Sequence, residues 1–546
     1  MPEPLRGLAQ LARLSGVQTA YQDTEGRRHV ASSRTLLSVL RALGLDVSGP
    51  ADVARELRRL RQERWRRLIE PVSLAWDGAA QPLTLRLPAS AGGKVAVYVR
   101  PEEGAGEQAI SVGLAGLEER ASAEVEGVRY VERALPLPWA LPSGYHRLEV
   151  EAGRQRAEAL LISAPGRVFA RPGRRWGAFL PAYALHSHDS WGAGNLSDLR
   201  HAAEWTGRLG GSFFGTLPLL SAFLGEPFEP GPYRPVSRLF WSEFFLDVNC
   251  IPELAECADA LKTVASPEFQ REIAELRSLP LVDYRRQALL LRRVLQPLAD
   301  YFFAEERSRR PQFDRFLEDR PEAVDYARFR AATERSPQGW ATWPDPQRRG
   351  AIQPSDFDPA AGHYHLYVQW LLSEQLAAAA STGAGLYLDM PLGVHPLGYD
   401  VWREQDLFVQ GASAGAPPDD FFAGGQDWGV PPPHPQRLRE QGYTYLRDAL
   451  RNQMRYASML RIDHVMGLHR LFWVPSGCPA TEGVYVSYPA EELYAIVCLE
   501  SQRERCEVVG EDLGTVPRYV RREMSRHGLL RSYVLQFSLH GDRQQA

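Results

Sequence analysis

Cysteine is scarce in this sequence, and its arrangement excludes two common uses of the residue. Only 5 of the 546 residues are cysteine, and none stands in a C-x-x-C pair or beside a paired histidine motif. A small odd number without such spacing argues against a disulfide framework and against a structural zinc site, and it fits a reducing cytosol. We therefore predict a cytoplasmic protein without a metal.

Long hydrophobic runs and a charge imbalance are also missing. No apolar run is long enough to span a membrane, and the N-terminal residues MPEPLRGLAQLARLSG lack the apolar stretch of a signal peptide. The net charge is −4, which gives no electrostatic reason to expect nucleic acid or an anionic membrane as a partner. These absences predict a soluble protein with neither partner.

Aromatic residues, in contrast, are well represented, with 13 Trp, 21 Tyr and 21 Phe. Most of them are expected to fill the core. Several tryptophans, however, stand in loops rich in glycine and proline, where no core requires them. Flat aromatic side chains can bury the apolar C–H faces of sugar rings at a low entropic cost, so these positions favour a carbohydrate ligand.

Hydrophobic periodicity divides the chain into three regions. Residues 1–68 show the spacing of helices, as in SSRTLLSVLRALGL, where leucines recur behind possible serine caps. Residues 69–165 alternate apolar and polar residues between glycine and proline, which predicts a small β-sandwich. From 166 to 546, short apolar strands alternate with helices, and this alternation is typical of parallel βα units.

The third region predicts an α/β fold, a (β/α)8-type TIM barrel with a helical insertion at about 254–380. We count about six of the eight strands, so the barrel is expected to be incomplete at its C-terminus. The expected strands lie in WGAFLPAY, GSFFGTLPLL, AGLYLDMPLG, ASMLRIDHV, CEVVGEDLG and RSYVLQFSL.

Two of these strands end in residues that suit one particular chemistry. ASMLRIDHVMG carries Asp463, and CEVVGEDLG carries Glu511 and Asp512. One helix-length segment separates the strands, so their ends are expected at the same rim of the barrel. Two carboxylates about 5–5.5 Å apart flank the bond that a retaining glycosidase cleaves. Either motif alone could be structural, because Arg–Asp pairs also stabilise barrels and G-E-D is short.

The two carboxylates need different protonation states for that chemistry. Arg461 lies two positions before Asp463, projects to the same side of the strand, and should keep this carboxylate ionised for attack. Burial of Glu511 at a strand end should raise its pKa, as a general acid requires.

The stretch GAPPDDFFAGGQDWGVPPPHP at 415–435, read as a loop, closely resembles the signature of 4-α-glucanotransferases, or amylomaltases, of glycoside hydrolase family seventy-seven. The resemblance covers nearly the whole chain, including an N-terminal region like that of the longer bacterial members. Further matching segments, in the same order, are GPYRPVSRLF, HLYVQWLLSEQL, LYLDMPLGV…YDVW, RIDHVMGLHRLFWVP and VVGEDLGTVP.

The resemblance implies a role for each matching residue. Asp463 matches the nucleophile and Glu511 the general acid/base. The residues that match substrate-binding positions are Tyr233, Asp389, Asp400, Trp428, Arg461 and His464. Asp389 could equally be a structural carboxylate at a strand end. The sequence departs from the family at Gly231, where serine is usual, and at Leu397, where an acidic residue is common.

A third catalytic aspartate, which the related clan carries in a His-Asp motif, has no match here. The chain ends in VLQFSLHGDRQQA, in which His540 and Asp542 do not form that pair. Six strands would leave two open edges, so we interpret the chain as a fragment of a longer product in preference to a disabled relative.

The resemblance predicts transfer of α-1,4-glucan segments, with α-1,4-glucans and maltooligosaccharides as ligands and no cofactor. Two alternatives stay open, an α-glucan hydrolase and a glucan-binding protein without catalysis. The sandwich could bind glucan or brace the barrel.

Overall fold

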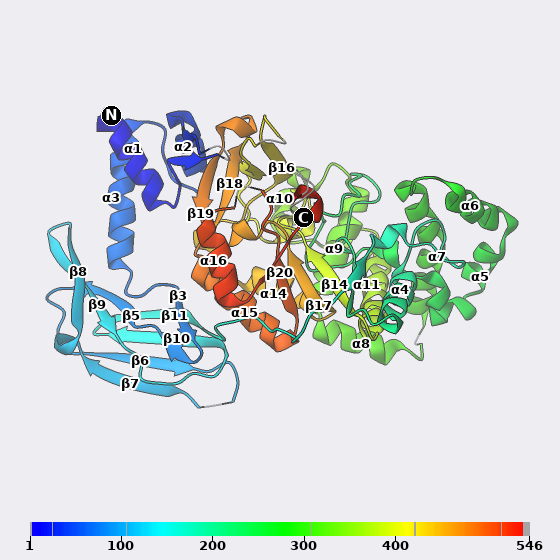
Figure 1. The fold of residues 1–546 in the computed structure, drawn as a ribbon, viewed down its shortest axis with the longest axis horizontal. Helices are drawn as coiled ribbons and strands as arrows, with labels where there is room; N and C mark the ends of the chain where they lie inside the picture. The colour runs from blue at the N-terminus through cyan, green and yellow to red at the C-terminus, as the bar shows by residue number, and fades with distance from the viewer. Residues whose placement is uncertain are drawn as a thin grey trace. The chain divides into compact units, whose positions relative to one another are not determined.

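The computed structural model describes residues 3–538, except for 24–25, 105, 306, 420–421 and 515. Figure 1 shows the helices and strands of the chain. The chain divides into two compact units. Unit 1 comprises residues 1–170, 406–450 and 464–546, and unit 2 comprises residues 171–405 and 451–463. His540 and Asp542 lie outside the described residues. Among the described helices, none combines the length and the apolar character that crossing a membrane requires.

Unit 1 begins with helices α1 (Glu3–Leu14), α2 (Ser33–Ala42) and α3 (Pro50–Arg66). The Ser32 side chain caps α2 by accepting the N–H of Thr35 at 3.0 Å, and Gly44 follows the end of the helix with a φ of +78°. The region is not wholly helical, because β1 (Ala20–Gln22) and β2 (Arg28–Val30) form an antiparallel pair between the first two helices.

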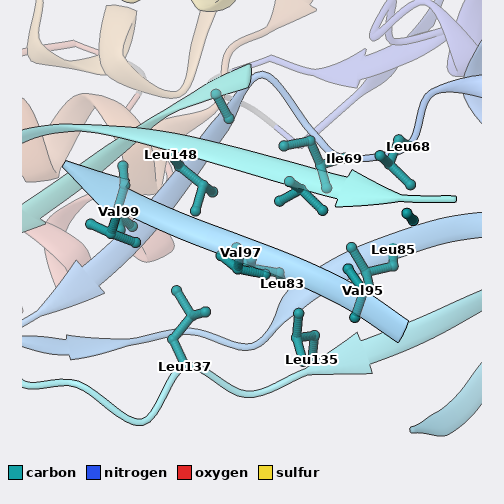
Figure 2. Packing of buried hydrophobic residues seen from close by; sticks show 14 of the residues in the cluster. Leu68, Ile69, Leu83, Leu85, Val95, Val97, Val99, Leu135, Leu137 and Leu148 are labelled. Carbon is teal, nitrogen blue, oxygen red and sulfur yellow. The ribbon is translucent and has the colours of Figure 1, made fainter. Parts of the chain in front are cut away.

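A β-sandwich follows, as the period of two predicts. One sheet has the order β4 (Ala79–Ala80), β3 (Val72–Trp76), β11 (Gln155–Ala164), β10 (Gly144–Ala152), β6 (Lys94–Arg100) and β7 (Gln108–Gly113). The other has the order β5 (Leu83–Pro88), β9 (Val128–Leu135) and β8 (Glu118–Val125). Figure 2 shows Val97 and Leu148 of the first sheet and Leu85 and Leu135 of the second in one fully buried cluster.

The rest of unit 1 combines an antiparallel sheet with a parallel strand pair. The sheet has the order β16 (Gln426–Val430), β15 (Ala412–Ala416), β18 (Arg470–Pro475) and β19 (Val484–Ser487). Strand β20 (Glu507–Gly510) runs parallel to β21 (Leu530–Arg531). The helices are α13 (Pro435–Glu440), α15 (Ala490–Glu504), α16 (Arg518–His527) and α17 (Leu535–Ser538), and α14 (Thr444–Met454) continues into the residues of unit 2.

Two expectations for these segments are wrong. The stretch 415–435 is not simply a loop, because its first two residues belong to β15 and residues 426–430 form β16, which pairs with β15. RSYVLQFSL does not form one strand: of its described residues only Arg531 pairs, as the last residue of β21, and α17 begins at Leu535. In both cases tertiary hydrogen bonding overrides the local composition.

Unit 2 holds the other strands of the incomplete (β/α)8-type barrel. β12 (Gly177–Phe179), β13 (Phe213–Gly215), β14 (Gly385–Met390) and β17 (Ala457–Ile462) are parallel neighbours in this order. Helix α4 (Leu196–Arg208) connects the first two. The insertion between β13 and β14 contains α5 (Ala258–Ala265), α6 (Pro267–Ser278), α7 (Tyr284–Ala304), α8 (Arg310–Asp319), α9 (Glu322–Arg335), α10 (Asp345–Arg348) and α11 (Pro359–Ala380), and α12 (Tyr399–Arg403) follows β14.

The sandwich core gives a test of packing. Leu148 is fully buried between its neighbouring strands, so we expect Leu148→Ala to lower the free energy of unfolding by about 2–5 kcal/mol in urea denaturation of the whole chain. Val128→Ala, at a residue that is 42% exposed, serves as the control and should cost less than about 1 kcal/mol. Equal losses in both variants would show that the cluster does not stabilise the sandwich.

Candidate active site

Two neighbouring strands of unit 2 place Asp389 and Arg461 side by side. In the parallel pair β14 and β17, Asp389 and Arg461 are register partners. The backbone N–H of Asp463, just after β17, donates to the carbonyl of Met390 at 3.0 Å. Parallel strands end at a common edge, and in a (β/α)8-type barrel that edge carries the active site. The register therefore brings two carboxylates and one guanidinium to the same place.

The Arg461 guanidinium joins the two carboxylates. Its Nη1 donates to Oδ1 of Asp389 at 2.6 Å, and its Nη2 lies 2.8 Å from Oδ1 of Asp463. The Asp389 side chain is almost completely buried, whereas those of Arg461 and Asp463 remain about one-fifth exposed. Short charge-assisted contacts to a planar donor fix both the position and the orientation of a carboxylate. Asp463 is therefore held rigidly while it still faces solvent.

Tyr233 completes this cluster from the segment before the insertion. Its hydroxyl donates to the other Asp389 oxygen, Oδ2, at 2.7 Å, and its ring lies 5.9 Å from the Arg461 guanidinium. The side chain is 37% exposed. The residue is thus partly accessible to a ligand while its hydroxyl is anchored.

Burial and charge oppose each other at Asp389. Burial raises the pKa of its carboxyl to about 6, although the Arg461 charge and the Tyr233 hydroxyl lower it and the Asp463 charge raises it. Burial and the neighbouring Asp389 charge likewise raise the pKa of Tyr233 well above its ordinary range, so Tyr233 remains a hydrogen-bond donor.

In unit 1, the Glu511 carboxylate is held by backbone N–H groups. Oε2 accepts the N–H of His464 at 3.0 Å, and Oε1 accepts the N–H of Leu513 at 2.7 Å. The N–H of Val465 donates to the Glu511 carbonyl at 3.0 Å. His464 adopts a left-handed φ of +47°, a conformation that a histidine takes only at a cost. The turn is therefore constrained where it meets Glu511.

Asp512 has a structural environment, unlike its neighbour Glu511. Its buried Oδ2 accepts from Nε of Arg521 at 3.0 Å and from Nε of Arg531 at 2.7 Å, and its Oδ1 accepts the N–H of Ser532 at 3.2 Å. Asp512 thus ties the residues after β20 to α16 and to the segment around β21.

Trp428 and His464 meet within unit 1. Their rings are 5.0 Å apart at an interplanar angle of 74°, an edge-to-face contact. Trp428 lies on β16, so the antiparallel sheet determines its position. The indole and the imidazole therefore pack against each other.

Asp400 lies in a different environment from the other residues that are predicted to bind substrate. It is buried at the start of α12, where it accepts the Ser237 hydroxyl and the N–H of Arg238. These bonds hold the segment that follows Tyr233. The structure therefore gives Asp400 a bracing contact, and its binding of substrate stays a prediction.

The sequence predicts these residues as a site, but it does not predict most of their contacts. Tyr233 and Asp389 are 156 positions apart, so no sequence motif predicts their hydrogen bond. The Asp389–Arg461 partnership follows from strand register, which the apolar pattern of the two strands does not specify. Asp463 and His464 are consecutive in the chain. The residue directly after Asp463 therefore supplies the backbone N–H that donates to Glu511. In the described part of the chain, no group of His, Cys, Asp and Glu side chains could hold a metal ion.

Comparison with family models gives two matches. Residues 180–546 match a family described as 4-alpha-glucanotransferase, and residues 68–165 match the MalQ N-terminal beta sandwich domain.

Curated relatives agree with these models. A 4-alpha-glucanotransferase from Mycobacterium tuberculosis is 33% identical over 569 residues, which cover 99% of this chain and 77% of the relative. One from Haemophilus influenzae is 32% identical over 436 residues, which cover 74% of this chain and 62% of the relative.

Solved structures agree as well. A crystal structure of amylomaltase from Corynebacterium glutamicum matches 98% of this chain and 75% of its own, with a TM-score of 0.82 and 27% identity. An amylomaltase from Streptococcus agalactiae in complex with acarbose matches 68% of this chain and 76% of its own, with a TM-score of 0.57 and 21% identity, and supports the fold alone.

The raised pKa of Asp389 has a measurable consequence. A carboxyl with a folded-state pKa near 6 and an ordinary value of 3.8 contributes stability below about pH 4 that is lost as the pH rises through 6. We expect this contribution to the free energy of unfolding to fall by about 3 kcal/mol across that window, and Asp389→Asn to remove it. Urea denaturation from pH 4 to 7 measures the difference. Asp314→Asn, at an exposed position on α8, is the control. If Asp389→Asn leaves the pH dependence of the free energy of unfolding unchanged, the raised pKa of Asp389 is contradicted.

Proposed function

The chain belongs to the 4-alpha-glucanotransferase family, and from this we propose that Asp463 and Glu511 catalyse transfer of α-1,4-glucan segments between glucan chains. The observation that carries the proposal is the 33% identity to a 4-alpha-glucanotransferase across 99% of the chain. The Tyr233–Asp389–Arg461–Asp463 contacts support it, because they present one exposed carboxylate in a fixed orientation.

The proposed reaction is a double displacement. An Asp463 oxygen attacks the anomeric carbon and forms a glucosyl ester, while the bond to the glycosidic oxygen breaks and that oxygen takes the proton of Glu511. In the second step, Glu511 removes the proton of an acceptor 4-hydroxyl, whose oxygen displaces Asp463. The anomeric configuration is retained, and the reaction consumes no cofactor.

Each carboxylate has the support that its role needs. Arg461 pairs with Asp463 and so holds the oxygen that attacks in a fixed orientation. The N–H groups of His464 and Leu513 hold both oxygens of Glu511, which fixes the direction of proton transfer.

The predicted substrate-binding residues divide between two surfaces. We assign the Tyr233 ring and the Arg461 guanidinium to the sugar next to the cleaved bond, with Asp389 and Asp400 as the carboxylates that hold this surface. His464 is assigned to the same sugar as Arg461, and the Trp428 indole, which packs against His464, is assigned to the acceptor. An aromatic acceptor surface favours a sugar over water, because it orients the ring and excludes solvent.

We also propose a domain division into 1–68, 69–165 and 166–546, with the sandwich match at 68–165 in its support. A cytoplasmic location is proposed with it, and the absence of a disulfide among the cysteines of the described residues is consistent with a reducing compartment.

Incubation with maltotriose tests the proposed activity. Transfer predicts glucose together with a ladder of longer maltooligosaccharides in a chromatographic separation of the products. Shortening without longer products would favour an α-glucan hydrolase. Binding without turnover would favour a glucan-binding protein.

The two carboxylates can be tested individually in the same assay. Asp463→Asn and Glu511→Gln remove the nucleophile and the proton donor, and each is expected to lower kcat by at least about 10²–10⁴-fold. Glu504→Gln, at an exposed residue that ends α15, is the matched control and should retain the wild-type rate. The assignment fails if either active-site variant stays within a few-fold of wild type.

A further inference from the structure

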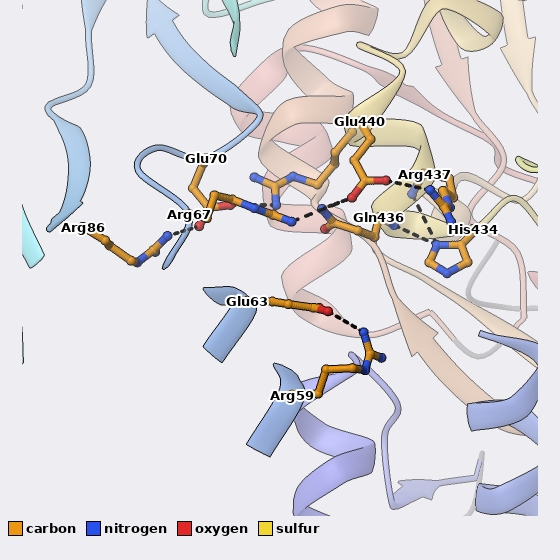
Figure 3. A network of polar contacts seen from close by, with 10 residues as sticks. Arg59, Glu63, Arg67, Glu70, Arg86, His434, Gln436, Arg437 and Glu440 are labelled. Atoms are coloured by element: carbon orange, nitrogen blue, oxygen red, sulfur yellow. Dashed lines mark hydrogen bonds and ion pairs between the residues drawn. The ribbon is translucent and has the colours of Figure 1, made fainter. Parts of the chain in front are cut away.

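A large cavity lies within unit 1, away from the predicted catalytic residues. Its volume is about 870 Å³, within the range of about 300–1,000 Å³ typical of ligand pockets. Helix α3 forms one wall, and residues 434–440 form the facing wall (Figure 3). The ends of α1 and α2 and part of β8 complete the lining. None of the lining residues belongs to the candidate active site.

Several charged groups of the two walls form pairs. Arg59 donates to Glu63 at 2.6 Å on α3. On the facing wall Glu440 accepts from Arg437 at 3.2 Å and from Gln436 at 3.1 Å, and Arg67 lies 3.8 Å from the same Glu440 (Figure 3). These pairs hold their members as oriented donors and acceptors, and the six arginines and four glutamates of the lining leave it a small positive excess. Oriented donors and acceptors of this kind can bind the hydroxyl groups of a ligand.

Trp65 adds an apolar surface to this polar lining. It is partly exposed on α3, and no aromatic ring contact is found for it among the described residues. Leu14 and Leu60 line the same cavity. A tryptophan that faces a cavity without a ring partner can bury the C–H face of a sugar, while neighbouring polar groups bind its hydroxyls.

Arg61 and Arg64 supply further donors beside this indole. Both line the cavity, and neither forms an ion pair within the described residues. Arg61 lies one helical turn before Trp65, so the two side chains leave α3 on the same face. Exposed guanidinium groups can donate several hydrogen bonds to hydroxyl oxygens without prior breakage of an ion pair.

We propose that this cavity is a second, non-catalytic glucan-binding site that holds an α-1,4-linked maltooligosaccharide segment against Trp65. The choice of ligand rests on the proposed function. In this role the N-terminal helices retain a long glucan on the enzyme between transfer events, and the effective concentration of glucan ends near the catalytic residues rises.

Calorimetric titration with maltoheptaose tests the proposal. The whole chain with Asp463→Asn and Glu511→Gln is used, so that the ligand is not consumed. Two binding events per chain are expected. Trp65→Ala should weaken one of them roughly tenfold, and the double variant Arg61→Ala/Arg64→Ala should weaken the same event. Because both arginines are exposed, the double variant tests the site without removal of a packed side chain.

Two controls separate this site from the catalytic one. Trp205→Ala, at a residue of α4 that is 54% exposed, should leave both events unchanged. Trp428→Ala should weaken only the binding event that does not depend on Trp65. If the titration shows only the binding event that depends on Trp65, the second glucan-binding site is supported and the proposed catalytic function is contradicted.

Two results overturn the second site. One is that Trp65→Ala and the double arginine variant leave both events intact. The other is that inorganic pyrophosphate, but not maltoheptaose, binds in a manner that depends on Arg61 and Arg64, because the cavity is then an anion site.

Discussion

The guanidinium of Arg461 pairs with two carboxylates, and the arrangement of the site in unit 2 depends on that contact. Asp389 is almost completely buried, so without Arg461 its charge would be left uncompensated in the interior, at a cost of about 3–5 kcal/mol. Asp463 would lose the donor that orients it. The register of β14 and β17 makes the arrangement possible, because Asp389 and Arg461 are partners on adjacent strands. Tyr233 contacts the same buried carboxylate, which links a segment before the insertion to the same site.

Glu511 is held in another way, by the backbone. The N–H groups of His464 and Leu513 reach its two oxygens, and the left-handed conformation of His464 belongs to the same turn. Backbone donors cannot change rotamer, so they fix a carboxylate without a second buried charge. A side chain thus orients the proposed nucleophile, and the main chain orients the proposed acid/base.

Much of the fold could be predicted from local signals. The serine cap and the leucine spacing predict α2, and short apolar runs predict β14, β17 and β20. What could not be predicted depends on contacts between distant segments. The 415–435 stretch is rich in glycine and proline, yet β15 pairs with β18 and β16 with β15. The Tyr233–Asp389 bond and the arginine partners of Asp512 likewise join residues whose proximity exists only in the folded chain.

The central claim is that Asp463 forms a covalent bond to the sugar and Glu511 controls its formation and release. Mass spectrometry of the Glu511→Gln variant after incubation with α-maltosyl fluoride tests it most directly. This donor has a leaving group that needs no acid, whereas release of the sugar to an acceptor needs the base that the variant lacks. The account predicts a maltosyl ester that accumulates on the peptide containing Asp463. An adduct on another carboxylate, or unmodified protein while the fluoride is consumed, would contradict it.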